Sequence, residues 1–326
     1  RGYDSAGIAV VEKGVIKVEK CKGRLANLVD KMAVDGKPQG HCGIGHTRWA
    51  THGEPSDINS HPHGNKRVSI VHNGIIENYK QIKDFLIEEG YSFVSETDTE
   101  TVAKLLDYYY VDDPVDTIIK VLSEIKGSYA LGIMFRDYPD TVFAVRKECP
   151  LIVGVGENEN FLASDVPAII KYTRDYYLLE ANEIAVVKKD SVQIYDMHKE
   201  PVHKEINTAD WDVDAAEKGG YEHFMLKEIH EQPAAVRDTV SPRIINGMPD
   251  LSQDGVDMQK LKDYRQIFIV ACGTAMHAGM VGKYVIEKLA RKPVIVDIAS
   301  EFRYRDPIIT KDDLMIVISQ SGETAD

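Results

Sequence analysis

Alternating apolar and polar residues near the start of the chain predict β-strands. Apolar residues at 8–11 and 15–18 flank a Lys-Gly pair, a pattern typical of a hairpin with a tight turn. The apolar runs at 42–46 and 68–72 each end in a polar loop. We therefore expect two buried strands whose ends carry side chains into a site.

Helical spacing dominates the residues around and after these runs. Residues 25–33 predict a short helix, and apolar residues three or four apart over 76–86 predict a helix that ends at Gly90. The same spacing predicts helices over 101–110 and 115–125. Further strands are predicted at 129–135, 141–145, 151–155 and 183–195. Strands, then helices, then strands favour stacked layers over a simple alternating wind.

The second part of the chain has a different pattern. Residues 197–219 are polar and charged, and their few apolar residues show no helical or strand periodicity, which favours a domain boundary there. Later residues predict strands at 267–271, 294–296 and 314–318 and a helix at 275–290. This order is typical of a parallel α/β domain, and three strands make it incomplete. We predict a first domain over 1–210, a linker and helix over 211–240, and a second domain over 241–326.

Composition excludes several classes of partner. The 326 residues carry a net charge of −13, which repels nucleic-acid phosphates and anionic lipid, so we expect neither nucleic acid nor a membrane as a partner. The four cysteines have no close pairing, which favours a reducing, cytoplasmic location. The chain begins at Arg1 without a methionine and stops just after a Ser- and Thr-containing loop, so we expect a longer parent protein.

Candidate binding residues gather on the loop 46–56. Arg48 can form a two-pronged pair with a carboxylate, and Asp98 can accept from an ammonium group, so together they could bind both charged groups of a free amino acid. The alternative is an ordinary surface ion pair.

Asn73-Gly74, which follows the apolar run at 68–72, offers a side-chain amide and a backbone N–H. Such donors stabilise the oxyanion of an acyl-transfer intermediate. A simple turn is the alternative interpretation.

Two further side-chain types suggest sites that the pattern does not support. Six histidines lie between residues 41 and 72, but a proline splits the closest pair and no acidic partner follows at ligand spacing, so we expect no metal. Cys42 has its amide nitrogen in a peptide bond, and an N-terminal nucleophile needs a free amine. We interpret Cys42 as a buried strand cysteine.

Hydroxyl groups follow two strands of the second domain. Thr274 comes after the first strand, and Ser319-Gln320-Ser321-Gly322-Glu323-Thr324 follows the third. Hydroxyls and backbone N–H groups around a glycine favour a phosphate site without a lysine. A helix cap is the alternative, although it explains one hydroxyl better than three.

Several motifs together resemble the glutamine:fructose-6-phosphate aminotransferases (isomerising), also called glucosamine-6-phosphate synthases. They are residues 1–7, 46–56, 61–63, 72–78, 95–100, 299–305 and 319–325. The resemblance spans essentially the whole chain. It implies an α+β N-terminal-nucleophile (class II glutaminase) domain with αββα layers, followed by an incomplete α/β sugar isomerase (SIS) domain with a parallel sheet.

The resemblance also implies the reaction and the residues. It implies transfer of the glutamine amide nitrogen to fructose 6-phosphate, the first step of hexosamine biosynthesis, without a cofactor, by a homodimer. Glutamine would be bound by Arg1, Arg48, Trp49, Thr51, His52 and Asp98, with Trp49 also gating ammonia passage. The oxyanion would be bound by Asn73 and Gly74. Fructose 6-phosphate would be bound by Thr274, Ser319, Gln320, Ser321 and Thr324.

Two departures from the family pattern matter. Ala275 occupies a position where a serine commonly donates to the phosphate, so one hydrogen bond would be lost, at about 1 kcal/mol. The family's nucleophilic cysteine lies upstream of Arg1, and its isomerase acid and base groups lie downstream of Asp326. We expect residues 1–326 alone to bind substrates without turnover.

Two other functions remain as alternatives. One is another class II amidotransferase, such as a phosphoribosyl-transferring enzyme, which would need an acidic pyrophosphate-sugar motif that 319–324 does not supply. The other is a regulator that senses sugar phosphates through the SIS-type domain. The amide-handling loop in the first 200 residues argues against the regulator.

Overall fold

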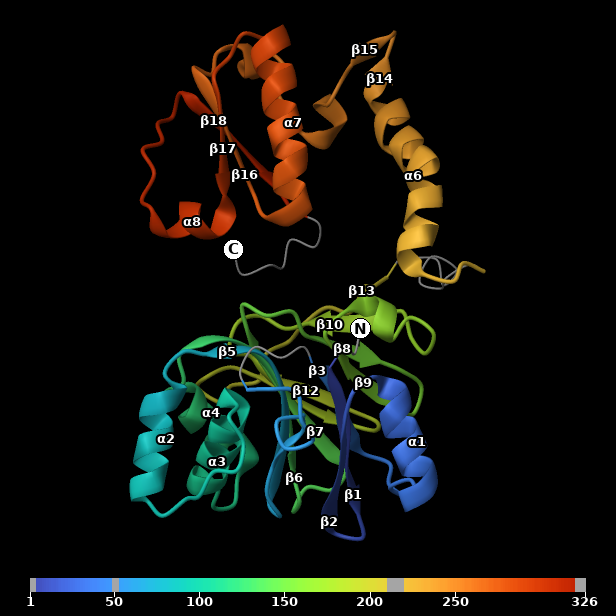
Figure 1. Ribbon diagram of the computed structural model, residues 1–326, viewed down its shortest axis with the longest axis vertical. Coiled ribbons are helices and arrows are strands. Elements are labelled where there is room, and N and C mark those ends of the chain that lie inside the picture. The colour runs from blue at the N-terminus through green and yellow to red at the C-terminus, as the bar shows by residue number, and fades with distance from the viewer. Residues whose placement is uncertain (1–3, 49–52, 210–219, 320–326) are drawn as a thin grey trace. The chain divides into compact units, whose positions relative to one another are not determined.

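The computed structural model describes residues 4–48, 53–209 and 220–319. The chain divides into two compact units, Arg1–Val213 and Asp214–Asp326 (Figure 1). Each unit is described by itself. The domain bounds at 210 and 240 stay predictions. Among the described residues, none of the helices combines the length and the apolar character that a bilayer crossing requires.

A six-stranded antiparallel sheet lies at the centre of the first unit, in the order β12-β11-β7-β6-β5-β4. Its strands are β4 (His63–Gly64), β5 (Val68–Ile76), β6 (Gly127–Phe135), β7 (Thr141–Lys147), β11 (Ile184–Lys188) and β12 (Val192–Tyr195). Most residues of β6 are buried, because other layers cover both faces of this sheet.

Three helices cover one face of the six-stranded sheet. They are α2 (Tyr79–Glu88), α3 (Asp98–Tyr109) and α4 (Pro114–Leu122). Their apolar sides pack against β5 to β7 in the largest buried cluster of the described residues. Thr97 caps α3 by accepting from the Glu100 N–H, and Asp113 caps α4 in the same way for Val115 and Asp116.

Two smaller sheets cover the opposite face. The first has the order β2-β1-β3 and the second β13-β10-β8-β9. Their strands are β1 (Ser5–Glu12), β2 (Val15–Lys22), β3 (Gly43–Arg48), β8 (Ile152–Val155), β9 (Asn160–Ala163), β10 (Asp175–Leu178) and β13 (Asn207–Thr208), and α1 (Leu25–Asp35) packs on β1 and β2. Ala9 and Ile44 meet Met134 of β6 across the sheets. The layers are therefore helix, sheet, sheet and helix, which confirms the predicted αββα arrangement.

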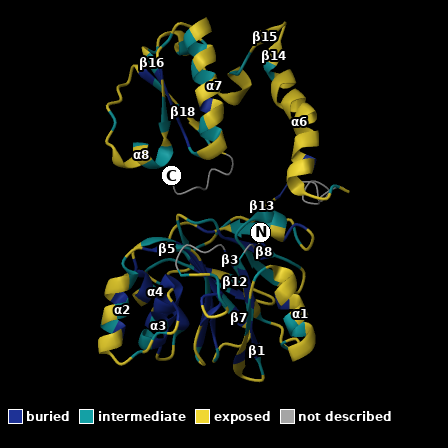
Figure 2. Cartoon of the chain, in the orientation of Figure 1, coloured by how far each residue is buried: buried dark blue, intermediate teal, exposed yellow. Residues whose placement is uncertain are grey.

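The second unit contains a three-stranded parallel sheet in the order β17-β16-β18. Its elements are α6 (Phe224–Val240), β14 (Ile244–Ile245), β15 (Met248–Pro249), β16 (Gln266–Ala271), α7 (Gly273–Leu289), β17 (Val294–Ile298), α8 (Ala299–Tyr304) and β18 (Asp313–Ile318). Short 3-10 turns lie at Val166–Ala168 in the first unit and at Ser241–Arg243, Ser252–Asp254 and Lys260–Lys262 in the second. The core is small, and much of α6 and α7 is exposed (Figure 2). The predicted parallel α/β order is confirmed.

The structure corrects two predicted elements. The single strand predicted at 183–195 is wrong, because β11 and β12 form a hairpin in which Val187 pairs with Val192. The helix predicted from residue 76 begins at Tyr79, because Ile76 still pairs with Gly127 in β5. The spacing between Ile76 and the apolar residues of α2 fits a helix, but Ile76 is buried as part of the sheet. The strands β9 and β10 and the helix α8 were not predicted.

Candidate functional site

A cavity of about 720 Å³ opens in the first unit where β3 faces β5. Arg48 and Asp98 both line it. Each is 4% exposed, so the two opposite charges are held in a largely desolvated setting. The alternative of a surface ion pair is therefore wrong. A cavity with a guanidinium and a carboxylate can bind both charged groups of a zwitterion.

Arg48 is placed by the end of β3. Its backbone pairs with Ser5 of β1, and its Nη2 donates to the Gly53 carbonyl at 3.3 Å. Burial lowers the pKa of the guanidinium, while the charges of Asp4 and Asp98 act in the opposite direction. Because the pKa of a guanidinium lies far above neutral pH to begin with, Arg48 stays charged.

Asp98 is the first residue of α3. Its Oδ2 accepts from the Ile76 N–H at 2.9 Å, which ties the start of the helix to the end of β5. A helix N-terminus favours negative charge through its exposed N–H groups. The carboxylate is thus fixed in position at the cavity wall.

Asn73 and Gly74 lie inside β5, paired with Ala130 and Tyr129 of β6. The alternative of a simple turn is therefore wrong. Gly74 has φ +119°, and a Cβ there would lie 2.1 Å from the Ser128 carbonyl oxygen. Only glycine fits this backbone. Asn73 is exposed, lines the cavity and has its Oδ1 2.7 Å from Nε2 of His46.

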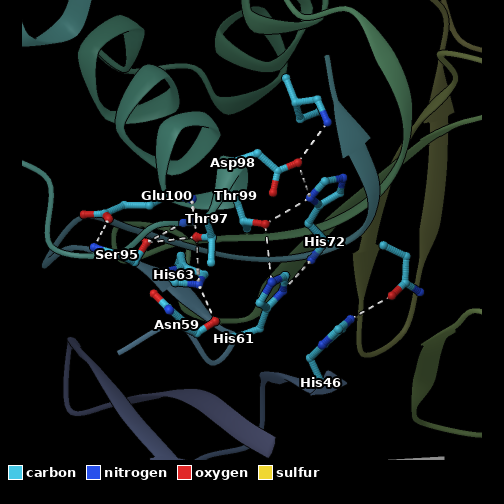
Figure 3. A network of polar contacts seen from close by, with 12 residues as sticks. His46, Asn59, His61, His63, His72, Ser95, Thr97, Asp98, Thr99 and Glu100 are labelled. Atoms are coloured by element: carbon cyan, nitrogen blue, oxygen red, sulfur yellow. Dashed lines mark hydrogen bonds and ion pairs between the residues drawn. The ribbon is translucent and has the colours of Figure 1, made fainter. Parts of the chain in front are cut away.

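Four imidazoles gather beside these residues (Figure 3). The ring of His61 stacks on His46 at 4.4 Å and on His72 at 6.5 Å, and it meets His63 edge-on at 5.1 Å. Burial lowers the pKa of His46 and His61, and it lowers that of His63 to about 3. These three rings are neutral near pH 7. Across the ranges 4–48, 53–209 and 220–319, no group of three or more His, Cys, Asp or Glu side chains could hold a metal ion.

Hydroxyl groups connect the imidazoles to α3. Thr99 Oγ1 lies 3.0 Å from His72 Nδ1 and 3.3 Å from His61 Nε2, and Thr97 Oγ1 lies 3.2 Å from His63 Nε2. Neither these threonines nor His46 is among the predicted site residues. The period of two along β3, which places His46 and Arg48 on one face, could have indicated His46.

Several predicted residues lie outside the described part of the chain. They are Arg1, Trp49, Thr51, His52, Gln320, Ser321 and Thr324. The prediction of a buried strand cysteine is wrong, because Cys42 is half-buried and lies just before β3. Partial burial still raises the pKa of its thiol to about 11. A thiol at that pKa is a poor nucleophile at neutral pH.

In the second unit the structure brings Thr274 and Ser319 to one edge of the sheet. Ala271 and Ile318 are paired at the carboxyl ends of the parallel strands β16 and β18, and each predicted loop follows directly. Cys272 is the N-cap of α7 and makes no side-chain capping bond, and Gly273 has φ +56°. The first turn of α7 thus keeps backbone N–H groups that an anion could use.

Comparison with known protein families supports two parts in this order. The family described as a glutamine amidotransferase domain matches residues 46–171, and the SIS domain family matches residues 260–326. Among solved structures, a glutamine phosphoribosylpyrophosphate amidotransferase from B. subtilis aligns with a TM-score of 0.53 at 17% identity, over 95% of this chain and 66% of that one. An allosteric regulatory enzyme of purine biosynthesis aligns at 0.56 and 18% identity, over 91% and 75%. At these identities the likeness shows the fold alone, and it is an amidotransferase fold.

Curated relatives match the whole chain more closely. Glutamine--fructose-6-phosphate aminotransferases [isomerizing] of Clostridium acetobutylicum and Clostridium tetani are 59% and 57% identical to it over its full length. The enzyme of that name from Caldanaerobacter subterraneus is 59% identical. The chain covers 54% of each of these relatives. The chain is therefore similar to these aminotransferases along its whole length, and it spans about half the length of the relatives that it matches.

Proposed function

We propose that the protein carrying this chain moves the amide nitrogen of glutamine onto fructose 6-phosphate, giving glucosamine 6-phosphate and glutamate. The observation that carries this proposal is the shared cavity of Arg48 and Asp98, with Asn73 and Gly74 on the same wall. The 59% identity with an aminotransferase of that name supports the choice of substrates.

In this proposal the first unit hydrolyses glutamine. Arg48 binds the α-carboxylate and Asp98 the α-ammonium group, so the side-chain amide extends toward Asn73. A cysteine thiolate, supplied upstream as the family resemblance implies, adds to the amide carbon and forms a tetrahedral oxyanion. Donors from Asn73 and Gly74 stabilise that oxyanion by roughly 3 to 4 kcal/mol each. The free amine of that cysteine, which took the thiol proton, returns the proton to the amide nitrogen, so ammonia leaves as the oxyanion collapses to a thioester. Water then hydrolyses the thioester to glutamate and regenerates the thiol.

Residues outside the described part complete this site in the proposal. Thr51 and His52 close over the bound glutamine, Trp49 gates the passage of ammonia, and Arg1 orders the surroundings of the nucleophile. These roles rest on the family resemblance alone.

The second unit binds fructose 6-phosphate in this proposal. Thr274, Ser319 and the first turn of α7 stand at one edge of the parallel sheet, where ligands of such sheets bind. The family resemblance adds Gln320, Ser321 and Thr324, which follow Ser319 in the sequence. No cofactor is needed, because the nitrogen arrives as ammonia.

We further propose that the protein is a cytoplasmic homodimer. The free thiols of all four cysteines support a reducing compartment. The family resemblance supports the dimer, and the mass of the full-length protein in solution tests it.

Two titrations test the function against its alternatives. Calorimetry of this protein with glutamine and, separately, with fructose 6-phosphate should show one binding event for each ligand. Binding of a pyrophosphorylated ribose in place of fructose 6-phosphate would favour the phosphoribosyl-transferring alternative. Binding of the sugar phosphate without glutamine would favour a sugar-phosphate-sensing regulator.

A further inference from the structure

The side chain of His46 determines which way the Asn73 amide faces. The Nε2 atom of His46 lies 2.7 Å from Oδ1 of Asn73. Because a carbonyl oxygen only accepts hydrogen bonds, the imidazole proton must lie on Nε2. The amide NH₂ group of Asn73 then points away from His46. Since Asn73 is exposed and lines the cavity, that NH₂ group is available to a ligand there.

The other ring nitrogen of His46 fixes this arrangement. Its Nδ1 atom is buried and has no hydrogen-bond partner among the described residues. Burial also lowers the pKa of His46, so the ring carries a single proton near pH 7. A proton on Nδ1 would be a buried donor without an acceptor, at a cost of about 1 to 3 kcal/mol. In that state Nε2 would accept from a turned Asn73 amide, and the donor would leave the cavity.

The plane of the His46 ring is held by its neighbour. His61 stacks on it at 4.4 Å with an interplanar angle of 21°. His61 is itself fixed on both sides, because its Nδ1 accepts from the His72 backbone N–H at 3.3 Å and its Nε2 lies 3.3 Å from Thr99 Oγ1. Strand β5 and helix α3 thus orient His61, and His61 orients His46 (Figure 3).

We propose that His46 is a positioning residue for the acyl-transfer step, which it serves by holding the Asn73 amide donor toward the oxyanion. The inference rests on the proposed function. His46 acts through Asn73 rather than on the substrate. Its removal should therefore weaken the transition state and leave the binding of glutamine nearly unchanged.

Two substitutions in the full-length protein test this role. His46→Leu keeps the size of the side chain and removes the donor, so kcat for glutamine hydrolysis should fall about 10- to 100-fold while KM changes less than about twofold. His46→Gln can place an N–H near the same point. It should restore kcat to within about fivefold of the wild type.

His63→Leu is the matched control, because His63 belongs to the same imidazole cluster but its ring bonds to Asn59 and Thr97 rather than to Asn73. Its kcat should stay within about threefold of the wild type. An equal loss in His46→Leu and His63→Leu, with no recovery in His46→Gln, would show that packing of the cluster matters and would overturn the proposal.

A binding measurement separates orientation from general damage. In the γ-aldehyde analogue of glutamine, the thiolate sulfur adds to the aldehyde carbon, and the electrons of the carbonyl double bond move to the oxygen. That oxygen then lies where the oxyanion forms during the reaction. His46→Leu should raise the inhibition constant of this aldehyde by the same factor by which it lowers kcat. The inhibition constant of glutamate should stay unchanged. Equal weakening of both inhibitors contradicts the positioning role.

The outcomes also distinguish the two proposals. A full-length wild-type protein that releases no glutamate from glutamine would defeat the proposed function. A wild-type protein that does so, with a His46→Leu variant of the same kcat, would defeat only the role of His46.

Discussion

The two candidate binding regions differ in how many polar groups are fixed before a ligand arrives. In the first unit Asp98, Thr97 and Thr99 are at most 4% exposed and are held by hydrogen bonds to a strand or to imidazoles. In the second unit Thr274 is exposed, and Cys272 makes no capping bond. The difference fits the two roles proposed above. Stabilising a developing oxyanion favours donors that are fixed in advance, since preorganised donors cost no reorganisation during the reaction. A site proposed only to hold a phosphate can be ordered by the phosphate.

The largest effect is expected at Gly74. In Gly74→Ala the new Cβ would meet the Ser128 carbonyl oxygen at 2.1 Å, on a backbone with φ +119°. We expect glutamine hydrolysis by the full-length protein to fall more than about 100-fold, because the oxyanion donor must shift. Steady-state glutamate release measures this.

Gly282→Ala in α7 serves as the control for that substitution. Its Cβ would have only Ile269 Cδ1 within 4 Å, at 3.7 Å. We expect unchanged hydrolysis and a second unit stabilised by up to about 1 kcal/mol, because alanine favours helix over glycine. If Gly74→Ala and Gly282→Ala reduce glutamine hydrolysis equally, the first unit is no more rigid than the second.

The second effect concerns Asp98. Asp98→Asn keeps an oxygen that can accept from the Ile76 N–H. It removes the charge that, in the proposed function, would bind the ammonium group of glutamine. We expect KM for glutamine to rise about 100-fold, in the range of a lost charged hydrogen bond of roughly 3 kcal/mol. Calorimetry with fructose 6-phosphate should give the wild-type Kd. A matching loss at the sugar site would show that the two regions are not independent.

The third effect is on stability against pH. Burial holds the pKa values of His61 and His63 far below 6.5, to about 3 for His63. The unfolded chain therefore binds more protons between pH 6.5 and about 3, and the free energy of unfolding falls as the pH drops through that window. Each histidine contributes a slope of up to about 1.4 kcal/mol per pH unit below pH 6.5.

The unfolding temperature of the first unit should consequently fall between pH 7.5 and pH 5.5 by more than that of the second unit. Removing one titrating group in His63→Gln should reduce the pH slope. If the unfolding temperature of the first unit does not change over this pH range, these rings are not buried in the neutral state.

The smallest effect is expected in the second unit. Ala275→Ser adds a hydroxyl in the first turn of α7. One added hydrogen bond to phosphate, at about 1 kcal/mol, should lower the Kd for fructose 6-phosphate about fivefold. Titration calorimetry measures the change. An unchanged Kd would indicate that another group already serves the phosphate.

Local patterns predicted much of the fold. The hairpin of β1 and β2, the helices α1 and α7 and the parallel order of β16, β17 and β18 follow from periodicity and glycine placement. The break between β11 and β12 was missed, because Lys188 to Ser191 is a polar turn inside an otherwise continuous strand-like run. Strand β9, with its half-buried residues, gave little periodic contrast.

The site was predictable where one residue type implies one chemistry. Arg48 and Asp98 were assigned by charge, and their common cavity agrees with that assignment. The imidazole cluster was not predicted, because its members come from β3, β4, β5 and the loop before β4, and they meet only through the packing of the sheets. No role was predicted for these histidines, for which no metal was expected. In the structure their rings stack on one another and bond to threonines.

Asp98 joins two duties in one carboxylate, since it faces the cavity and also fastens the first turn of α3 to the last residue of β5. A substitution at this position therefore changes both the charge of the cavity and the attachment of α3 to β5. An engineer who wants the cavity to accept an uncharged guest cannot simply neutralise this side chain with an apolar residue. A replacement acceptor for the Ile76 amide has to be supplied in the same step, or the helix will drift from its strand.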